Sequence, residues 1–139
     1  MILIDAGPIV ALLDADDPNH AACVEAVSQF PKNPFLTTWP CFTEAMYLLG
    51  RTGGYQYQDL LWRLWSDDRI IFADLTVEEI DQMSIFMNRY KNVPMDLADA
   101  SLVVMAESRP SARILTLDSD FFIYRAANGS VLDVIHCSP

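Results

Sequence analysis

Short apolar segments alternate with longer amphipathic segments along the whole chain. The first of them, Met1-Ile-Leu-Ile-Asp5, is an apolar run that ends abruptly in a carboxylate. Bounded apolar runs of this length are typical of buried strands. Asp5 would therefore lie at the C-terminal tip of a strand, which we expect to be the central one. Similar short runs predict four more strands, at 35–38, 70–72, 114–117 and 131–135.

The segments between these strands carry the signals of helix ends. Pro8 fits the first turn of a helix, and Pro40 with Gly50 marks the beginning and the end of another. Thr76 and Glu79 have the spacing of a capping box, which predicts a helix running to about residue 90. The other predicted helices span 20–30, 55–65, 96–107 and a short stretch after residue 118.

Strands that alternate with helices predict a parallel sheet with helices on both faces. The chain of 139 residues has the size of one domain and contains no repeat, low-complexity segment or interior linker. We therefore expect a single α/β domain over residues 1–139, built as a three-layer sandwich.

The composition supports a compact fold and adds one electrostatic constraint. Apolar residues make up 52% and charged residues 20% of the chain, which argues against disorder. Lys and Arg number 9 against 19 Asp and Glu, so the formal net charge is −10. This surplus disfavours binding of nucleic acid through phosphate contacts alone. It also supplies the carboxylates of a divalent-metal site, so the charge by itself decides neither question.

The cysteines and the N-terminus indicate a cytoplasmic protein. Cys23, Cys41 and Cys137 are odd in number and widely spaced, which predicts neither a disulfide framework nor a zinc site and favours a reducing compartment. The N-terminus lacks the pattern of a signal peptide. No apolar run approaches the roughly 18–20 residues of a membrane span, so we expect no membrane association.

Acidic residues from separate segments are predicted to meet at one edge of the sheet. Asp5 and Asp118 each follow a strand, and the carboxyl ends of parallel strands share one edge. Asp96 and Asp99 lie three residues apart at the start of an apolar helix, and hence on one face. Glu44 belongs to an apolar helical stripe, which would point its carboxylate inward, where it needs a partner.

A divalent cation is the most economical partner for these acids. The only lysines, Lys32 and Lys91, fall in predicted loops or helix ends. Oxygen ligands with no His or Cys nearby in the sequence select Mg²⁺ or Mn²⁺ rather than zinc.

Each acid also has a purely structural interpretation. Asp5 could cap the helix that follows it. Asp96 with Asp99, and Asp118 with Asp120, could each be a cap and a first-turn acid. Glu44 would face solvent if its helix were rotated. Capping does not forbid metal binding, however, and it does not explain why separate segments bring acids to the same edge.

Five segments, taken together, resemble the PIN domain, and in particular the VapC-type toxin ribonucleases of bacterial toxin–antitoxin pairs. They cover nearly the whole chain in the expected order: Ile2–Asp5, Ile9–Leu13, Thr43-Glu44, Asp96–Ala100 and Leu115–Phe121.

This resemblance implies a central, mainly parallel five-stranded sheet and a Mg²⁺- or Mn²⁺-dependent endoribonuclease. It implies that Asp5, Glu44, Asp99 and Asp118 are both the catalytic residues and the metal ligands. The expected partners are an RNA substrate, a cognate antitoxin and a second copy of the chain in a homodimer. Weaker candidates by the same resemblance are Asp96, Asp120, Thr116 and Arg125.

Two other functions fit parts of the sequence. A PIN-like scaffold would bind a protein partner or a metal without nuclease activity, consistent with the net charge of −10. A receiver or phosphatase domain also gathers acids at a sheet edge. Here, however, Asp5 is followed by Ala6-Gly7, and no lysine follows Lys91.

An aromatic-rich segment leaves two structural roles open. Trp62 and Trp65 lie near Tyr55 and Tyr57 in a predicted helix. They are expected in the core or on a contact surface, such as an interface with another chain.

Overall fold

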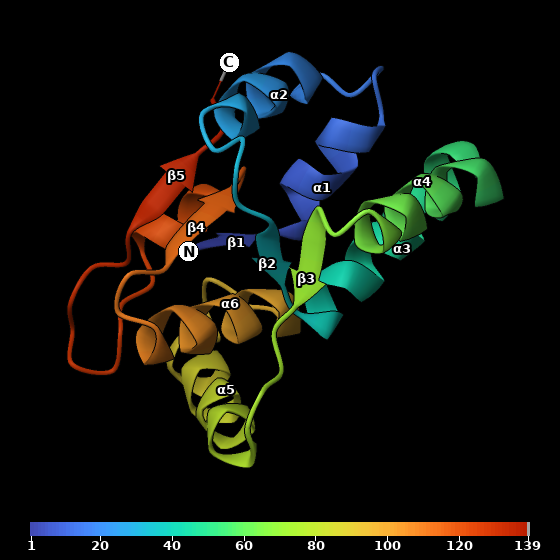
Figure 1. Ribbon diagram of the computed structural model, residues 1–139. Coiled ribbons are helices and arrows are strands. Elements are labelled where there is room, and N and C mark those ends of the chain that lie inside the picture. Colours follow the sequence, from blue (N-terminus) through green and yellow to red (C-terminus); the bar gives the residue numbers. More distant parts are fainter. Residues whose placement is uncertain (139) are drawn as a thin grey trace.

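A computed structural model describes residues 1–138 and contains a sheet of five parallel strands (Figure 1). The strand order is β3-β2-β1-β4-β5, so β1 is the central strand, as predicted. The strands are β1 (Ile2–Ile4), β2 (Phe35–Thr37), β3 (Ile70–Phe72), β4 (Arg113–Thr116) and β5 (Val134–His136).

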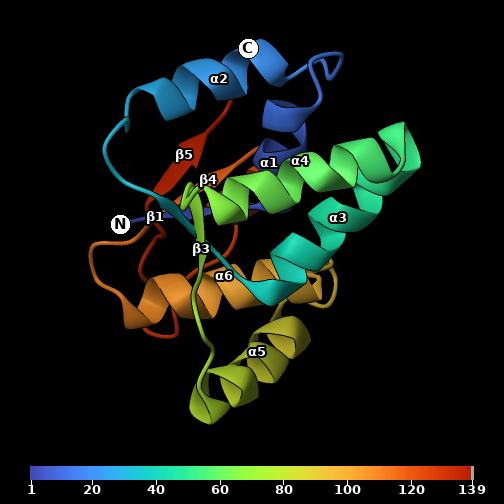
Figure 2. The same cartoon turned by 45° about the vertical axis from the view of Figure 1, so that its right-hand side comes forward.

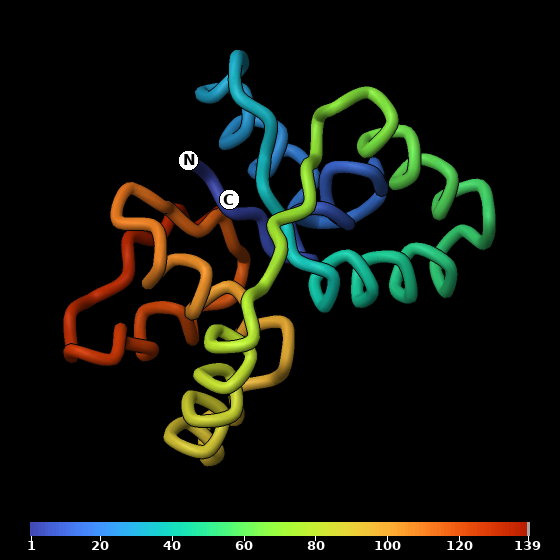
Figure 3. The backbone as a smooth tube through the Cα atoms, turned by 60° about the horizontal axis from the view of Figure 1, so that its bottom comes forward, coloured from blue at the N-terminus to red at the C-terminus, as the bar shows by residue number. Residues whose placement is uncertain are grey.

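Helices cover both faces of this sheet and complete the three-layer sandwich (Figure 2). α1, α2 and α4 lie on one side, and α5 and α6 lie on the other. α3 and α4 form an antiparallel hairpin that projects to one side of the sheet (Figure 3). The helices are α1 (Ala6–Leu13), α2 (His20–Ser28), α3 (Trp39–Gly53), α4 (Tyr55–Ser66), α5 (Val77–Arg89), α6 (Leu97–Ser108) and the 3₁₀ helix η1 (Ser119–Phe122).

The central strand β1 contributes side chains to both hydrophobic cores. Leu3 packs into the core beneath α5 and α6, whereas Ile2 and Ile4 pack into the core beneath α1–α4. All three side chains are buried, and the alternation follows the two-residue period of a strand. Leu3 pairs with Leu36 of β2 on one side and with Ile114 of β4 on the other. The first apolar run is therefore the element around which the cores are arranged.

Two predicted boundaries are wrong for identifiable reasons. Gly50 does not end its helix: α3 continues to Gly53, and Gly54, at φ 68°, provides the turn. The missing side chain at Gly50 instead admits Gln58 of α4, because a Cβ there would collide with it. The last strand begins at Val134 rather than Val131, which forms an isolated antiparallel bridge outside the sheet.

The aromatic segment of α4 contributes to the surface. Trp62 and Trp65 are 42% and 47% exposed, so they lie at the surface rather than in the core. The two rings meet edge to face at 6.2 Å between centroids. In the part of the chain that the structure describes, no helix has the length and apolar character needed to cross a bilayer.

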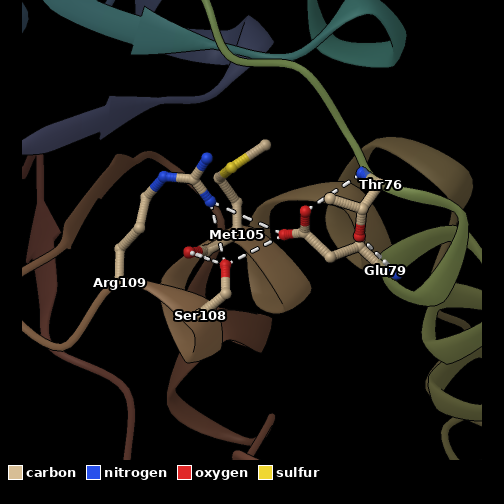
Figure 4. A network of polar contacts seen from close by, with 5 residues as sticks. All are labelled: Thr76, Glu79, Met105, Ser108 and Arg109. Carbon is tan, nitrogen blue, oxygen red and sulfur yellow. Dashed lines mark hydrogen bonds and ion pairs between the residues drawn. The ribbon is translucent and has the colours of Figure 1, made fainter.

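A polar network joins α5 to the C-terminal end of α6 (Figure 4). Thr76 and Glu79 form the predicted capping box, with both hydrogen bonds at 3.1 Å. The second carboxylate oxygen of Glu79 accepts a hydrogen bond from Ser108 at 2.9 Å and pairs with Arg109 at 3.5 Å. Burial raises the pKa of Glu79, but the hydrogen bonds from Thr76 and Ser108 outweigh it, so this pKa lies below its ordinary value.

Thr76→Ala removes this cap and should lower the free energy of unfolding by about 1 kcal/mol. Chemical denaturation monitored by circular dichroism would measure the change. Thr52→Ala is the matched control, because Thr52 is an exposed residue inside α3 whose hydroxyl bonds only to its own helix. Equal stability of the two variants would contradict the role given to the cap.

Candidate active site

Five carboxylates from four separate segments line one cavity at the carboxyl ends of β1 and β4. This cavity, called the acidic cavity below, has a volume of about 390 Å³. It receives the four acids predicted as catalytic and metal-binding, and also the weaker candidate Asp96. Its lining residues are Asp5, Gly7, Glu44, Asp96, Asp99, Leu117 and Asp118.

The carboxylate of Asp5 is held by two hydrogen bonds, one to each of its oxygens. It is only 7% exposed, and its Oδ1 accepts a hydrogen bond from the backbone N–H of Ala6 at 2.7 Å, so it does cap α1. Its Oδ2 accepts from the hydroxyl of Thr116 at 2.8 Å. The same hydroxyl accepts from the backbone N–H of Asp118 at 3.0 Å. Thr116, a weaker candidate from the sequence, is therefore buried beside the cavity and links two of its acids.

Asp99 is fixed by a capping box and by one distant tyrosine. Asp96 and Asp99 exchange hydrogen bonds at 2.8 and 3.3 Å at the start of α6. Tyr124, which is fully buried, donates its hydroxyl to Asp99 Oδ2 at 3.0 Å. Asp99 is itself only 6% exposed, whereas Asp96 is exposed. Sequence reasoning missed Tyr124, which lies two residues beyond the end of η1 and carries no local signal of this contact.

Glu44 and Asp118 lie nearer to solvent. The expectation that Glu44 points inward is wrong, because its side chain is exposed and forms part of the cavity wall from α3. Leu48, a member of the same stripe, is also exposed, so this stripe follows the edge of the packed face. Asp118 is half-buried and caps η1 through a 2.9 Å hydrogen bond from the backbone N–H of Asp120.

The remaining two candidates do not line the acidic cavity. Asp120 belongs to the first turn of η1. The guanidinium of Arg125 donates to the backbone carbonyls of Phe122, Ile123 and Tyr124 at 2.6, 3.2 and 3.1 Å. Arg125 therefore completes the C-terminal end of η1.

Burial and mutual repulsion raise the proton affinity of the clustered acids. Burial raises the pKa of Asp5, with smaller contributions from Asp96 and Asp118. Burial, followed by the charge of Asp96, raises the pKa of Asp99 to about 7. Although Glu44 is exposed, its partial desolvation in the cavity wall raises its pKa, and the charges of Asp96, Asp5 and Asp118 raise it further. These carboxylates therefore lie close enough to destabilise each other's charged forms.

No cationic side chain within residues 1–138 compensates this charge. The ion pairs in that range are Arg63–Asp59, Arg109–Glu79 and Arg113–Asp133, all away from the acidic cavity. Nor do any three His, Cys, Asp or Glu side chains of that range already converge as metal ligands. The donor set nevertheless fits Mg²⁺ or Mn²⁺ chemically, since it consists of carboxylate oxygens alone. Asp5, Asp96 and Asp99 are held by hydrogen bonds at helix starts, while Glu44 is exposed on α3.

Comparisons with known proteins agree with this geometry. The chain is 26% identical over 121 residues to Ribonuclease VapC26 of Mycobacterium tuberculosis, covering 87% of this chain and 89% of that protein. Its fold matches the crystal structure of the sarcin–ricin loop cleaving toxin VapC20 of the same organism. The TM-score is 0.78 at 17% identity, over 86% of this chain and 92% of that one. No protein-family model matches the chain.

A five-stranded parallel sheet flanked by helices, with acids at its carboxyl edge, defines the class as PIN-like. Within that class, the similarity to Ribonuclease VapC26 and the fold shared with VapC20 agree with the resemblance to VapC-type proteins that the sequence motifs carry.

The raised pKa of Asp99 predicts an inverse dependence of stability on pH. The folded protein holds this proton more tightly than the unfolded chain, so stability should fall as pH rises from about 4 to about 7. Asp99→Asn removes the charge. A side-chain oxygen in place of Oδ2 still accepts from Tyr124 and from the N–H of Asp96. In EDTA at pH 8 the variant should be more stable than the wild type, by on the order of 2 kcal/mol.

Urea denaturation at pH 4, 6 and 8 would measure this difference, which should shrink toward pH 4. Asp74→Asn, at an exposed loop position, is the control for loss of one surface charge. An Asp99→Asn variant less stable than the wild type at pH 8 would overturn the interpretation.

Proposed function

We propose that this chain is an endoribonuclease that hydrolyses RNA phosphodiester bonds, and that it is the toxin of a toxin–antitoxin pair. One observation carries the proposal: Asp5, Glu44, Asp99 and Asp118 come from four segments and line one cavity, with no cationic side chain from residues 1–138 in its lining. The similarity to Ribonuclease VapC26 and the fold shared with the toxin VapC20 support it independently.

The proposed cofactor is Mg²⁺ or Mn²⁺, held by Asp5, Glu44, Asp99 and Asp118, with Asp96 as a further ligand candidate. The chemistry that such a cation supplies when bound is polarisation of a phosphate oxygen and activation of a water molecule. Residues that do not bind the cation would position those that do. Thr116 and Tyr124 orient the two buried carboxylates through hydrogen bonds of 2.8 and 3.0 Å.

The carboxylates also make phosphate binding conditional. Five acids facing one cavity repel a phosphodiester, so RNA should approach the site only when their charge is neutralised. This links substrate binding to the cation rather than to basic side chains.

The expected partners follow from the same similarity. A VapC-type toxin would bind a cognate antitoxin, and a homodimer is a further expectation from the resemblance. We expect both in the cytoplasm. The exposed aromatic residues of α4, Trp62 and Trp65, offer a surface for either protein partner.

A second candidate function is that of a PIN-like scaffold that binds a partner or a metal without cleaving RNA. The net charge of −10 favours it, because few basic residues are present to hold a polyanion.

Asp5→Asn should abolish Mg²⁺-dependent RNA cleavage and leave the fold intact. Asparagine is as good a helix cap as aspartate, so α1 should keep its start. Loss of residues that merely support metal ligands typically costs 10–100-fold, so loss of a ligand should reduce cleavage by more than about 100-fold. Gel-based cleavage of total RNA with Mg²⁺ or Mn²⁺, and then with EDTA, would measure this, alongside circular dichroism.

Asp74→Asn should cleave as the wild type does, because this exposed loop residue lies outside the acidic cavity. Full activity of Asp5→Asn, or cleavage that persists in EDTA, would contradict the assignment. Binding of Mn²⁺ by the wild type without cleavage of any RNA would favour the scaffold.

A further inference from the structure

A second cavity adjoins the acidic one and has a different chemical character. It has a volume of about 460 Å³, within the roughly 300–1,000 Å³ usual for small-ligand pockets. Glu44 and Asp96 belong to the walls of both cavities, so a molecule in one borders directly on the other. We call it the Trp39 cavity. Its lining residues are Trp39, Pro40, Thr43, Glu44, Asp96, Leu97 and Ala98.

The walls away from the shared acids are apolar and unusually exposed. Trp39 is 52% exposed and Leu97 is 53% exposed, although both are large hydrophobic residues at the first position of their helices. Such exposure close to a candidate active site indicates a contact surface. The two residues stand on α3 and α6, the elements that also supply Glu44 and Asp99.

Trp39 is held rigidly despite its exposure. Its ring stacks on Phe72 of β3 at 3.9 Å with an angle of 11° between planes. It also meets Phe42 edge to face at 5.7 Å. A ring fixed in this way loses little conformational entropy when it binds a flat partner, because its rotamer is already restricted.

The charge of the chain limits how it can hold RNA. No Lys or Arg lines either cavity among the residues that the structure describes, and the net charge is −10. Ionic contacts with phosphates, the usual main source of affinity, are therefore lacking at the site. Stacking of a base on an aromatic side chain contributes affinity without any charge.

We propose that the Trp39 cavity is a nucleobase subsite, in which one unpaired base of the RNA packs against Trp39 and Leu97. The phosphate beside that base would then face the acidic cavity. The inference rests on the proposed ribonuclease function and gives it a substrate class: single-stranded or looped RNA with an unstacked base. The acids in the wall of the Trp39 cavity also predict which bases bind best. Glu44 and Asp96 offer carboxylate acceptors, which favour bases with an exocyclic amino group (adenine, cytosine and guanine) over uracil.

Binding of short RNA by defined variants tests this subsite. The probes are fluorescein-labelled dodecamers of oligo(rA), oligo(rC) and oligo(rU), titrated with full-length protein in Ca²⁺ and followed by fluorescence anisotropy. Trp39→Ala should weaken binding of oligo(rA) and oligo(rC) about 10-fold, the typical loss of one stacked base. Leu97→Ala should weaken it in the same direction. Oligo(rU) should bind less tightly than the other two and should lose less from either substitution.

Two controls separate stacking from general damage. Trp39→Phe keeps an aromatic ring and should restore most of the affinity. Tyr55→Ala removes another exposed aromatic ring, which lines neither cavity, and should leave binding unchanged. The ratio of dissociation constants between Trp39→Ala and the wild type should also stay constant between 50 and 300 mM KCl, since stacking is not ionic.

Several results would overturn the subsite. One is a Trp39→Ala variant that binds all three oligonucleotides like Tyr55→Ala. Another is a variant with unchanged RNA affinity that no longer retains a co-expressed protein partner, which would make the cavity a protein interface. Cleavage that depends on Asp5 but not on Trp39 would refute the subsite alone. Trp39-dependent binding without any cleavage in Mg²⁺ or Mn²⁺ would refute the nuclease function and leave the subsite standing.

Discussion

The constraint on which this structure depends is the burial of like charges without a cationic side chain. Asp5 and Asp99 are almost completely inaccessible, and neither pairs with Lys or Arg in residues 1–138. Hydrogen bonds supply what ion pairs do not: backbone N–H groups at helix starts, the Thr116 hydroxyl and the Tyr124 hydroxyl. The bonds that begin α1 and α6 are thus also the bonds that make the acidic cavity possible. The hydrogen bonds that cap these helices therefore also hold the acids of the cavity, so capping does not exclude a role in the site.

The same arrangement explains why the site is costly to the fold. A group whose charged form is disfavoured in the native state lowers native stability once it ionises. Natural proteins tolerate such local costs at functional positions and recover stability elsewhere. Two separate cores, one on each face of β1, provide that stability. The capping box of Thr76 and Glu79 and its link to α6 add to it on the face opposite α1.

Much of the fold and of the acidic cavity could be predicted from local sequence patterns, because strand burial and helix capping depend on neighbouring residues. The apolar run ending in Asp5 identified the central strand, and parallel strands necessarily bring Asp5 and Asp118 to one edge. Rotation of α3 was not predictable in the same way. The stripe through Glu44 has the period of a helix, but that period does not reveal which part of it the neighbouring elements leave uncovered. Asp96, ranked as a weaker candidate, lines the same cavity as the four main acids.

Tertiary contacts account for the remaining differences. Tyr124 reaches Asp99 across 25 residues, and Trp39 stacks on Phe72 of a different strand. Neither contact can be predicted from the hydrophobic periodicity of the sequence. Gly50 shows the converse: it has the local signal of a helix end, yet α3 continues past it, and Gln58 of α4 packs against it.

The helix starts at the acidic cavity have one further consequence. α1 and α6 both begin there, at Asp5 and Asp96, and each helix N-terminus carries a partial charge of roughly +0.5. Together they offset about one of the carboxylate charges. The electric potential in the cavity is therefore less negative than its five acids suggest, so an anionic ester meets a lower barrier on entering and its anionic product is less strongly expelled.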